Sequence, residues 1–170
     1  MHKKIKFSLA TFLVTGILLL TLGILALILK HPLIFPSLGP TAFLLATNPA
    51  AKIASAKNTV LGHLVGVICG YTALVLFGLT NTPAIIISGI SISFVLAAAL
   101  SIALTSAIMV LFSVEHPPAG ATTLIISLGI LHTIPNITVL MIAVILLYLE
   151  SRFINNLQIV KSARLLPKQK

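Results

Sequence analysis

Four apolar stretches, each long enough to cross a lipid bilayer as a helix, dominate this chain. They occupy residues 7–29, about 59–79, about 84–112 and about 137–157. Spanning about 30 Å of hydrocarbon takes roughly 20 helical residues, which every stretch supplies. The strict alternation of apolar and polar residues that is typical of a transmembrane β-barrel does not occur. The sequence therefore predicts an all-α, polytopic membrane helix bundle.

The composition agrees with a membrane protein and argues against a nucleic-acid-binding one. The chain has 170 residues, of which 58% are hydrophobic and 8% are charged, whereas soluble domains carry about 25% charged residues. Its lysines and arginines concentrate before the first apolar stretch and after the last one. Such flanking charge sets membrane orientation. We predict one transmembrane domain over residues 1–170, with a lipid bilayer as its surroundings and no nucleic-acid partner.

Two segments rich in proline and glycine separate the long stretches and resemble each other. The pattern Pro36-x-x-Gly39-x-Thr41 recurs as Pro117-x-x-Gly120-x-Thr122, and one constant interval separates the members of each pair. The same interval carries the first long stretch onto the third and the second onto the fourth. An internal repeat is therefore predicted, with repeat 1 over about 7–79 and repeat 2 over about 84–157. Each repeat would consist of a long helix, a broken short helix and another long helix.

Lysine positions bear on how the short segments meet the membrane. If each short segment crosses, the N-terminus, Lys52, Lys57 and the basic tail at 158–170 all lie on one side, which is then cytoplasmic. If the segments are re-entrant, Lys52 and Lys57 move to the opposite side. We favour six crossings with the repeats inverted, and expect a bacterial inner membrane. Asn48-Pro49 is expected to begin the helix after the first short one.

The inverted arrangement would bring two helix N-termini together inside the membrane. A helix N-terminus presents free N–H groups and a partial positive charge, so two facing ends would bind an anion. Gly39 and Gly120 would permit close approach of backbone or ligand. The alternative is that these residues only bend packed helices. The candidate substrate-binding residues are Pro36, Ser37, Gly39, Pro40, Thr41, Asn58, His63, Glu115, His116, Pro117, Pro118, Ala119, Gly120, Ala121 and Thr122.

Two histidines are the ionisable candidates. His116 follows Glu115, one of only two acidic residues in the chain, and an ionised carboxylate beside it would favour the protonated imidazole. His63 lies near the start of the second long stretch, preceded by Asn58, and an ionisable residue in a membrane stretch suggests function. The alternatives are an anchoring pair at the membrane interface for Glu115 and His116, and a helix-end hydrogen bond for His63.

Signatures of enzymes are missing from the sequence. It contains no HExxH, C-x-x-C, G-x-S-x-G or P-loop pattern, so we expect no catalytic residues, no metal and no cofactor. Small residues recur at four-residue spacing, which lets membrane helices pack closely and could also support a homo-oligomer. They are Gly62, Gly66 and Gly70 in one stretch, and Ser93, Ala97, Ser101 and Thr105 in another.

The motif EHPPAGATTL, together with the upstream FPSLGPTAFLLATNPAAKIASAKNTVLGHLVG, resembles the HPP family of integral membrane proteins. The resemblance covers roughly residues 29–149. It implies four transmembrane helices and a transport function, because some plant and cyanobacterial members are linked to nitrite transport. The function expected is thus a transporter or channel for a small monovalent anion, with nitrite as the best guess. The alternatives are a non-transporting scaffold subunit or a membrane-embedded enzyme.

Overall fold

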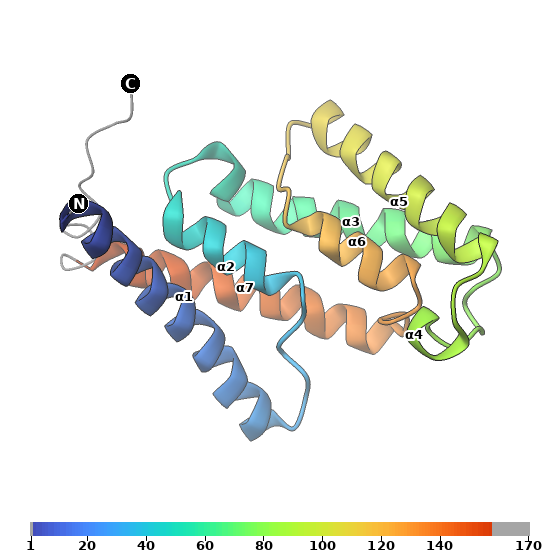
Figure 1. Cartoon of the computed structure of the whole chain (residues 1–170), viewed down its shortest axis with the longest axis horizontal. Helices are drawn as coiled ribbons and strands as arrows, with labels where there is room; N and C mark the ends of the chain where they lie inside the picture. The colour runs from blue at the N-terminus through green and yellow to red at the C-terminus, as the bar shows by residue number, and fades with distance from the viewer. Residues whose placement is uncertain (1, 158–170) are drawn as a thin grey trace.

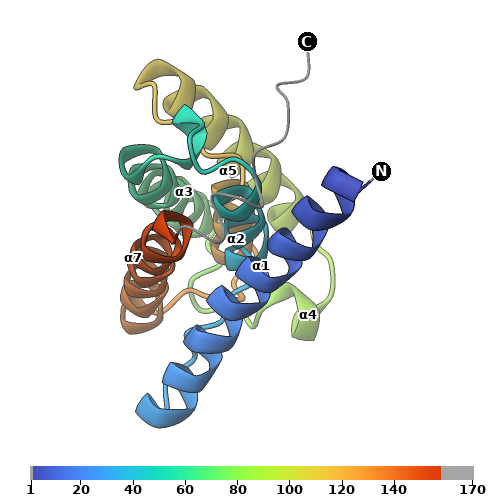
Figure 2. The ribbon, with the colours of Figure 1, turned by 90° about the vertical axis from the view of Figure 1, so that its left-hand side faces the viewer.

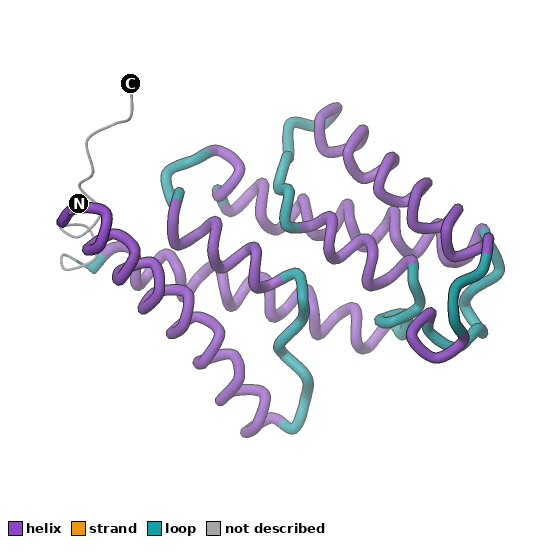
Figure 3. The backbone as a smooth tube through the Cα atoms, in the orientation of Figure 1, coloured by secondary structure: helices purple, strands orange, loops and turns teal. Residues whose placement is uncertain are grey.

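The computed structural model describes residues 2–157, and helices are the only regular elements in that range (Figures 1 and 3). The helices are α1 (His2–Leu29), α2 (Leu38–Thr47), the 3₁₀ turn η1 (Lys52–Ala54), α3 (Ala56–Leu76), α4 (Ile85–Ser88), α5 (Ile92–Leu111), α6 (Ala119–Ser127) and α7 (Ile134–Asn156). Of these, α1, α3, α5 and α7 are long and apolar enough to cross a membrane. The all-α membrane bundle is confirmed, whereas the basic tail at 158–170 lies outside the described residues.

Two local predictions were wrong. The third apolar stretch does not form one helix, because Gly89 adopts a positive φ of 80° and ends α4. The hydroxyl of Ser91 then accepts a hydrogen bond from the Phe94 N–H and starts α5. Asn48-Pro49 does not begin a helix either. Asn48 closes α2 by donating its N–H to the Leu44 carbonyl, and α3 starts later, after the N-cap Ser55.

The helix pairs that pack together form a regular pattern. Helix α3 packs against α5 and α6, helix α7 packs against α1 and α2, and α3 packs against α7. The remaining packed pairs of helices are α1 with α2 and α5 with α6. Exchanging α1, α2 and α3 for α5, α6 and α7 turns this set of pairs into itself. The pattern favours the internal repeat, with each repeat's last helix packed on the first two helices of the other, while the inversion itself stays a prediction.

The short helices α2 and α6 begin near the middle of the bundle and run away from each other (Figure 1). Helix α2 ends at the same end of the bundle as the start of α1 and the end of α7, where the Asn155 side chain donates a hydrogen bond to the Leu45 carbonyl. Helix α6 ends at the opposite end, where Leu128 accepts a hydrogen bond from the Ile85 N–H. The centre of the bundle is therefore where the two N-termini meet.

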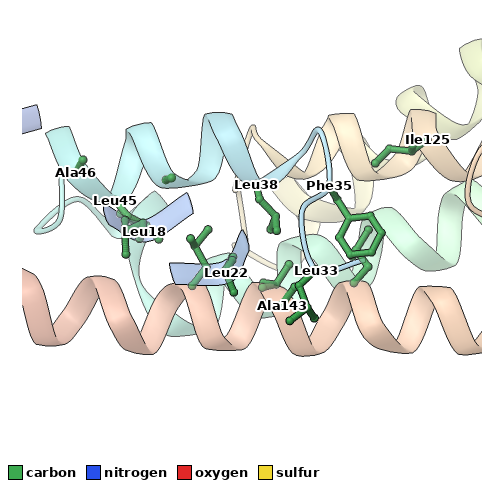
Figure 4. Packing of buried hydrophobic residues seen from close by; sticks show 14 of the residues in the cluster. Leu18, Leu22, Leu33, Phe35, Leu38, Leu45, Ala46, Ile125 and Ala143 are labelled. Carbon is green, nitrogen blue, oxygen red and sulfur yellow. The ribbon is translucent and has the colours of Figure 1, made fainter. Parts of the chain in front are cut away.

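The apolar core between α1, α2 and α7 is built from leucines and alanines. Leu18 and Leu22 of α1 lie between Leu45 of α2 and Ala143 of α7, all nearly or fully buried (Figure 4). The outer side of α1, which is inclined across the bundle in Figure 2, is apolar as well, with Leu27 80% exposed. A soluble protein rarely exposes so continuous an apolar face, so this side is the lipid-facing one.

A stripe of glycines on α3 receives α6. A Cβ added to Gly66 would lie 2.8 Å from the Ala119 carbonyl oxygen, and one on Gly70 would lie 2.7 Å from that of Thr123. On α5, the small residues Ala97, Ser101 and Thr105 are buried too. Most of both small-residue faces is therefore used in packing inside the chain, and a homo-oligomer stays a prediction.

Candidate functional site

The start of α3 holds the segment that leads into α6. The hydroxyl of Ser55 accepts a hydrogen bond from the N–H of Asn58 and donates one to its side-chain oxygen, 3.1 Å away. This fixes the Asn58 amide, whose Nδ2 donates to the Glu115 carbonyl at 2.9 Å. The Asn58 side chain thus holds the backbone of the Glu115-His116-Pro117-Pro118 segment in place. Both its amide oxygen and its amide nitrogen make a hydrogen bond.

The first turn of α6 follows the two prolines and is closed by its own hydrogen bonds. The N–H groups of Ala119, Gly120 and Ala121 donate to the carbonyls of His116, Pro117 and Pro118 at 2.9–3.1 Å. The expectation that these three N–H groups are free to bind an anion was therefore wrong. The proline-rich segment supplies the three acceptors itself, so the first turn closes as a series of tight turns. The partial positive charge of the helix end remains.

A cluster of polar side chains lies where α2 and α6 begin. Thr41 and Thr122 are each the fourth residue of their helix, and both contact the same imidazole of α3. His63 Nε2 lies 3.1 Å from the Thr41 hydroxyl, and His63 Nδ1 lies 2.7 Å from the Thr122 hydroxyl. All three side chains are completely buried. His63 is seven residues into α3, about 10 Å along its axis, so the cluster lies well inside the hydrophobic span.

His116 joins this cluster from the other side. Its Nδ1 donates a hydrogen bond to the Ile53 carbonyl at 2.7 Å, and its Nε2 lies 3.4 Å from the Thr41 hydroxyl. The rings of His63 and His116 are 5.1 Å apart between centroids. Of the residues that the sequence nominated, the structure thus brings together Thr41, Thr122 and both histidines, with Asn58 one step outside.

Two further hydroxyls in the same region have no hydrogen-bond partner among the described residues. They are Ser37 Oγ, one helical turn before Thr41, and Thr59 Oγ1, one turn before His63, and both side chains are fully buried. A buried polar atom without a partner is rare in a folded protein and commonly marks a place where water or a ligand binds. Thr59 was not nominated from the sequence, although its four-residue spacing from His63 places both on one helix face.

Glu115 does not pair with His116. Its Oε2 lies 3.9 Å from Nζ of Lys52, and the two side chains are 38% and 68% exposed. Such a partly exposed ion pair contributes little to stability. The expectation that the Glu115 carboxylate holds the neighbouring imidazole in its protonated form was wrong, since the two side chains of consecutive residues point to different partners. Removing the Glu115 carboxylate therefore breaks no direct contact with His116.

The remaining nominated residues lie beside the cluster rather than in it. Pro36 and Pro40 are exposed, and an added Cβ on Gly39 would meet nothing within 4 Å. At Gly120 the nearest atom would be Ile102 Cδ1 at 3.7 Å. Among residues 2–157, no other segment makes a close approach at Gly39 or Gly120, unlike at the glycines of α3.

Two cavities flank the proline-rich segment. One of about 360 Å³ lies between it and α5, and Thr105, Ser106, Glu115, His116 and Gly120 contribute to its wall. The other, of about 400 Å³, lies between the segment and α2. Pro117 lines both, the second together with Pro40, Pro118 and Ala121. The first cavity reaches the histidine cluster, because His116 belongs to both.

Sequence reasoning missed a buried pair of hydroxyl groups that joins α5 to α6. Thr105 Oγ1 and Thr123 Oγ1 lie 3.0 Å apart, and Thr123 also donates to the Ala119 carbonyl. Nothing in the local sequence pairs these two residues, since only the packing of α5 on α6 brings them together. In the described part of the chain, no group of three or more histidine, cysteine or acidic residues is placed to bind a metal ion.

The lipid-facing helices and the buried polar centre define a polytopic helical membrane protein. The chain belongs to the HPP family, because the family's sequence model, described as the HPP transmembrane region, matches residues 2–164. The match includes the His116-Pro117-Pro118 motif and both short helices. No curated protein and no solved structure shows significant similarity to the chain.

Proposed function

We propose that this protein is a transporter or channel for a small monovalent anion, with nitrite as the best guess for its substrate. The observation that carries the proposal is the convergence of Thr41 and Thr122, from the first turns of two opposed short helices, on the buried His63. The positive ends of both helices then act at one place, equivalent to about half a charge each.

The chemistry around this place suits an anion better than a cation. Hydroxyl groups and imidazole N–H groups can donate hydrogen bonds to it, and the unpartnered hydroxyls of Ser37 and Thr59 lie one turn away. The carboxylate of Glu115, which is adjacent to His116 in the sequence, faces Lys52 instead of the cluster. Because the side chains of the cluster are completely buried, a small ion suits it better than a large one. Nitrite rests on the family resemblance alone. We expect no enzymatic activity, since no catalytic signature accompanies these groups.

The alternative function is that of a scaffold subunit, and complete burial favours it. The side chains of Thr41, His63, His116 and Thr122 have no exposed surface. In a transporter this corresponds to a closed state between openings to either side; in a scaffold it is simply the core. Transport measurements separate the two, because only a transporter moves anions when it is reconstituted.

The test is uptake of nitrite, nitrate, formate and chloride by vesicles that contain the purified protein. We expect uptake above that of protein-free vesicles for nitrite, and a clear loss of that uptake on His116→Ala, together with a flatter dependence of uptake on pH. His132→Ala is the matched control, because His132 lies outside the cluster, with its Nδ1 at 2.9 Å from the nearby Gly129 carbonyl. Equal uptake by vesicles with and without protein, for all four anions, would leave the scaffold as the function.

We also propose that the N-terminus and the Lys52–Lys57 region face the cytoplasm. Cysteine labelling tests this in a Cys69→Ser background, since Cys69 is the only native cysteine. Ala56→Cys, at the exposed start of α3, should resist a membrane-impermeant maleimide in intact cells, whereas Asn81→Cys, exposed in the connection between α3 and α4, should react. The reverse labelling pattern would show that the orientation is inverted.

A further inference from the structure

The hydroxyl of Thr41 lies between two imidazole rings. Its Oγ1 is 3.1 Å from His63 Nε2 and 3.4 Å from His116 Nε2. It is also 2.8 Å from the Ser37 carbonyl oxygen, which accepts its proton. One hydroxyl proton therefore has three acceptors within reach, and two of them are ring nitrogens that can themselves take up a proton.

The Nδ1 atoms of the two rings, which are not the ones facing Thr41, have different hydrogen-bond partners. The Ile53 carbonyl only accepts, so Nδ1 of His116 carries a hydrogen. Neutral His116 therefore turns an unprotonated Nε2 toward Thr41. His63 is less constrained, because the Thr122 hydroxyl at its Nδ1 can either donate or accept. His63 can thus keep its proton on either nitrogen, while His116 presents one vacant nitrogen to Thr41.

We propose that His63, Thr41 and His116 form a proton relay that binds one proton and couples its movement to that of the anion. Protonated His116 gives its Nε2 proton to Thr41 Oγ1, and Thr41 passes its own hydroxyl proton to Nε2 of His63. For this step His63 holds its other proton on Nδ1, donated to Thr122. The step leaves His116 neutral, Thr41 unchanged and His63 an imidazolium, so the positive charge moves from one ring to the other.

The surroundings favour the binding of one extra proton, rather than two, by the pair of imidazole rings. Two imidazolium ions with ring centres 5.1 Å apart would repel each other in a medium of low dielectric constant. Helices α2, α5 and α6 carry no titratable side chain. The remaining titratable groups on the elements packed around the rings are His2, Lys3, Lys4, Lys6, Lys52, Lys57, Cys69, Tyr71, Glu115, Tyr148, Glu150 and Arg152. Of these, the carboxylate of Glu115 has Lys52 Nζ 3.9 Å away.

The coupling rests on the proposed function and makes it more specific. A monovalent anion that binds beside one imidazolium carries no net charge into the membrane, which avoids the large cost of burying an unpaired ion. The protein would then be a symporter of one proton and one anion. In this proposal the proton enters from the side of the cavity whose wall includes Glu115 and His116.

The relay can be tested without any transport assay, by following both rings with nitrogen NMR. The sample is full-length protein with ¹⁵N-labelled histidine in lipid bilayers, with His2, His31 and His132 each replaced by glutamine. We expect the signals of His63 and His116 to change in one shared step as the pH falls, corresponding to one proton. Thr41→Val should make the two rings respond separately, because it removes the hydroxyl between them. Thr41→Ser, which keeps the hydroxyl, should restore the shared step. Two independent steps in the sample that retains Thr41, or no effect of Thr41→Val, would overturn the relay.

Anion flux with a pH dye inside the vesicles then tests the coupling. We expect each anion taken up through the protein to bring in one proton, after subtraction of the leak in protein-free vesicles, and Thr41→Val to abolish this proton movement. Anion uptake that carries no proton would refute the coupling and leave the transport proposal intact. A shared NMR step without uptake of any of the four anions would refute transport, while the proton site would stand.

Discussion

Gly66→Ala is expected to lower the stability of the folded protein strongly, by about 1–3 kcal/mol in the free energy of unfolding. The added Cβ would lie 2.8 Å from the Ala119 carbonyl oxygen and 2.9 Å from Thr123 Oγ1. One of these contacts is backbone at the start of α6, which cannot turn aside as a long side chain can. Helix α6 must therefore move away from α3, which disturbs the hydrogen bond between Thr123 on α6 and Thr105 on α5.

The measurement is unfolding in mixed detergent micelles with increasing sodium dodecyl sulfate, followed by circular dichroism. Gly16→Ala is the matched control, because a Cβ there would meet nothing within 4 Å on the exposed side of α1. Alanine also favours a helix over glycine by up to about 1 kcal/mol, so this control should be unchanged or more stable. If both variants unfold at the same detergent fraction, α6 does not lie against α3 as described.

His63→Ala is expected to reduce anion uptake by roughly an order of magnitude or more. This side chain contacts the hydroxyls of both Thr41 and Thr122 and so joins the first turns of the two short helices. Two hydrogen bonds of about 0.5–1.5 kcal/mol each are lost, and every 1.36 kcal/mol corresponds to a tenfold change in rate. The cavity left by the ring also loosens the meeting point of α2 and α6.

Uptake by His63→Ala is compared with that by wild type and His132→Ala at matched amounts of reconstituted protein. The fraction of each variant that elutes as folded protein on gel filtration shows whether loss of uptake is loss of fold. His63→Gln keeps a side chain that can hydrogen-bond and should recover part of the uptake. Full activity of a folded His63→Ala protein would mean that the histidine only fills space, which agrees with the scaffold alternative.

Much of the fold follows directly from the order of apolar and polar residues. Each of the four long helices contains a stretch that the sequence marks as membrane-spanning, because a lipid bilayer leaves a backbone no partners other than its own. The short helices α2 and α6 also begin where the prolines indicate. The break at Gly89 was harder to see, since isoleucines surround it and only its positive φ ends the helix. Likewise, asparagine suits both the start and the end of a helix, and the folded structure places Asn48 at the end of α2.

The candidate site was also predictable from the sequence only in part, and tertiary contacts set the rest. The repeated Pro-x-x-Gly-x-Thr pattern and the isolated His63 identify Thr41, Thr122 and both histidines from residue type and spacing alone. Their convergence needs α3 to lie against α6 and the two short helices to start at one point, which are contacts between distant parts of the chain. The pairing of Glu115 with Lys52 instead of its neighbour His116 is also a tertiary result.

By itself, then, the sequence determined that this protein is an all-helical membrane protein with two similar short helices and a small set of polar residues between them. Hydrophobic length and backbone hydrogen bonding decide those features locally. Only the tertiary structure decided that the Thr41 hydroxyl stands between two imidazole rings and that the first-turn N–H groups of α6 are already bonded. Both depend on distances of a few ångströms between segments that are far apart in the chain, and helix packing sets such distances.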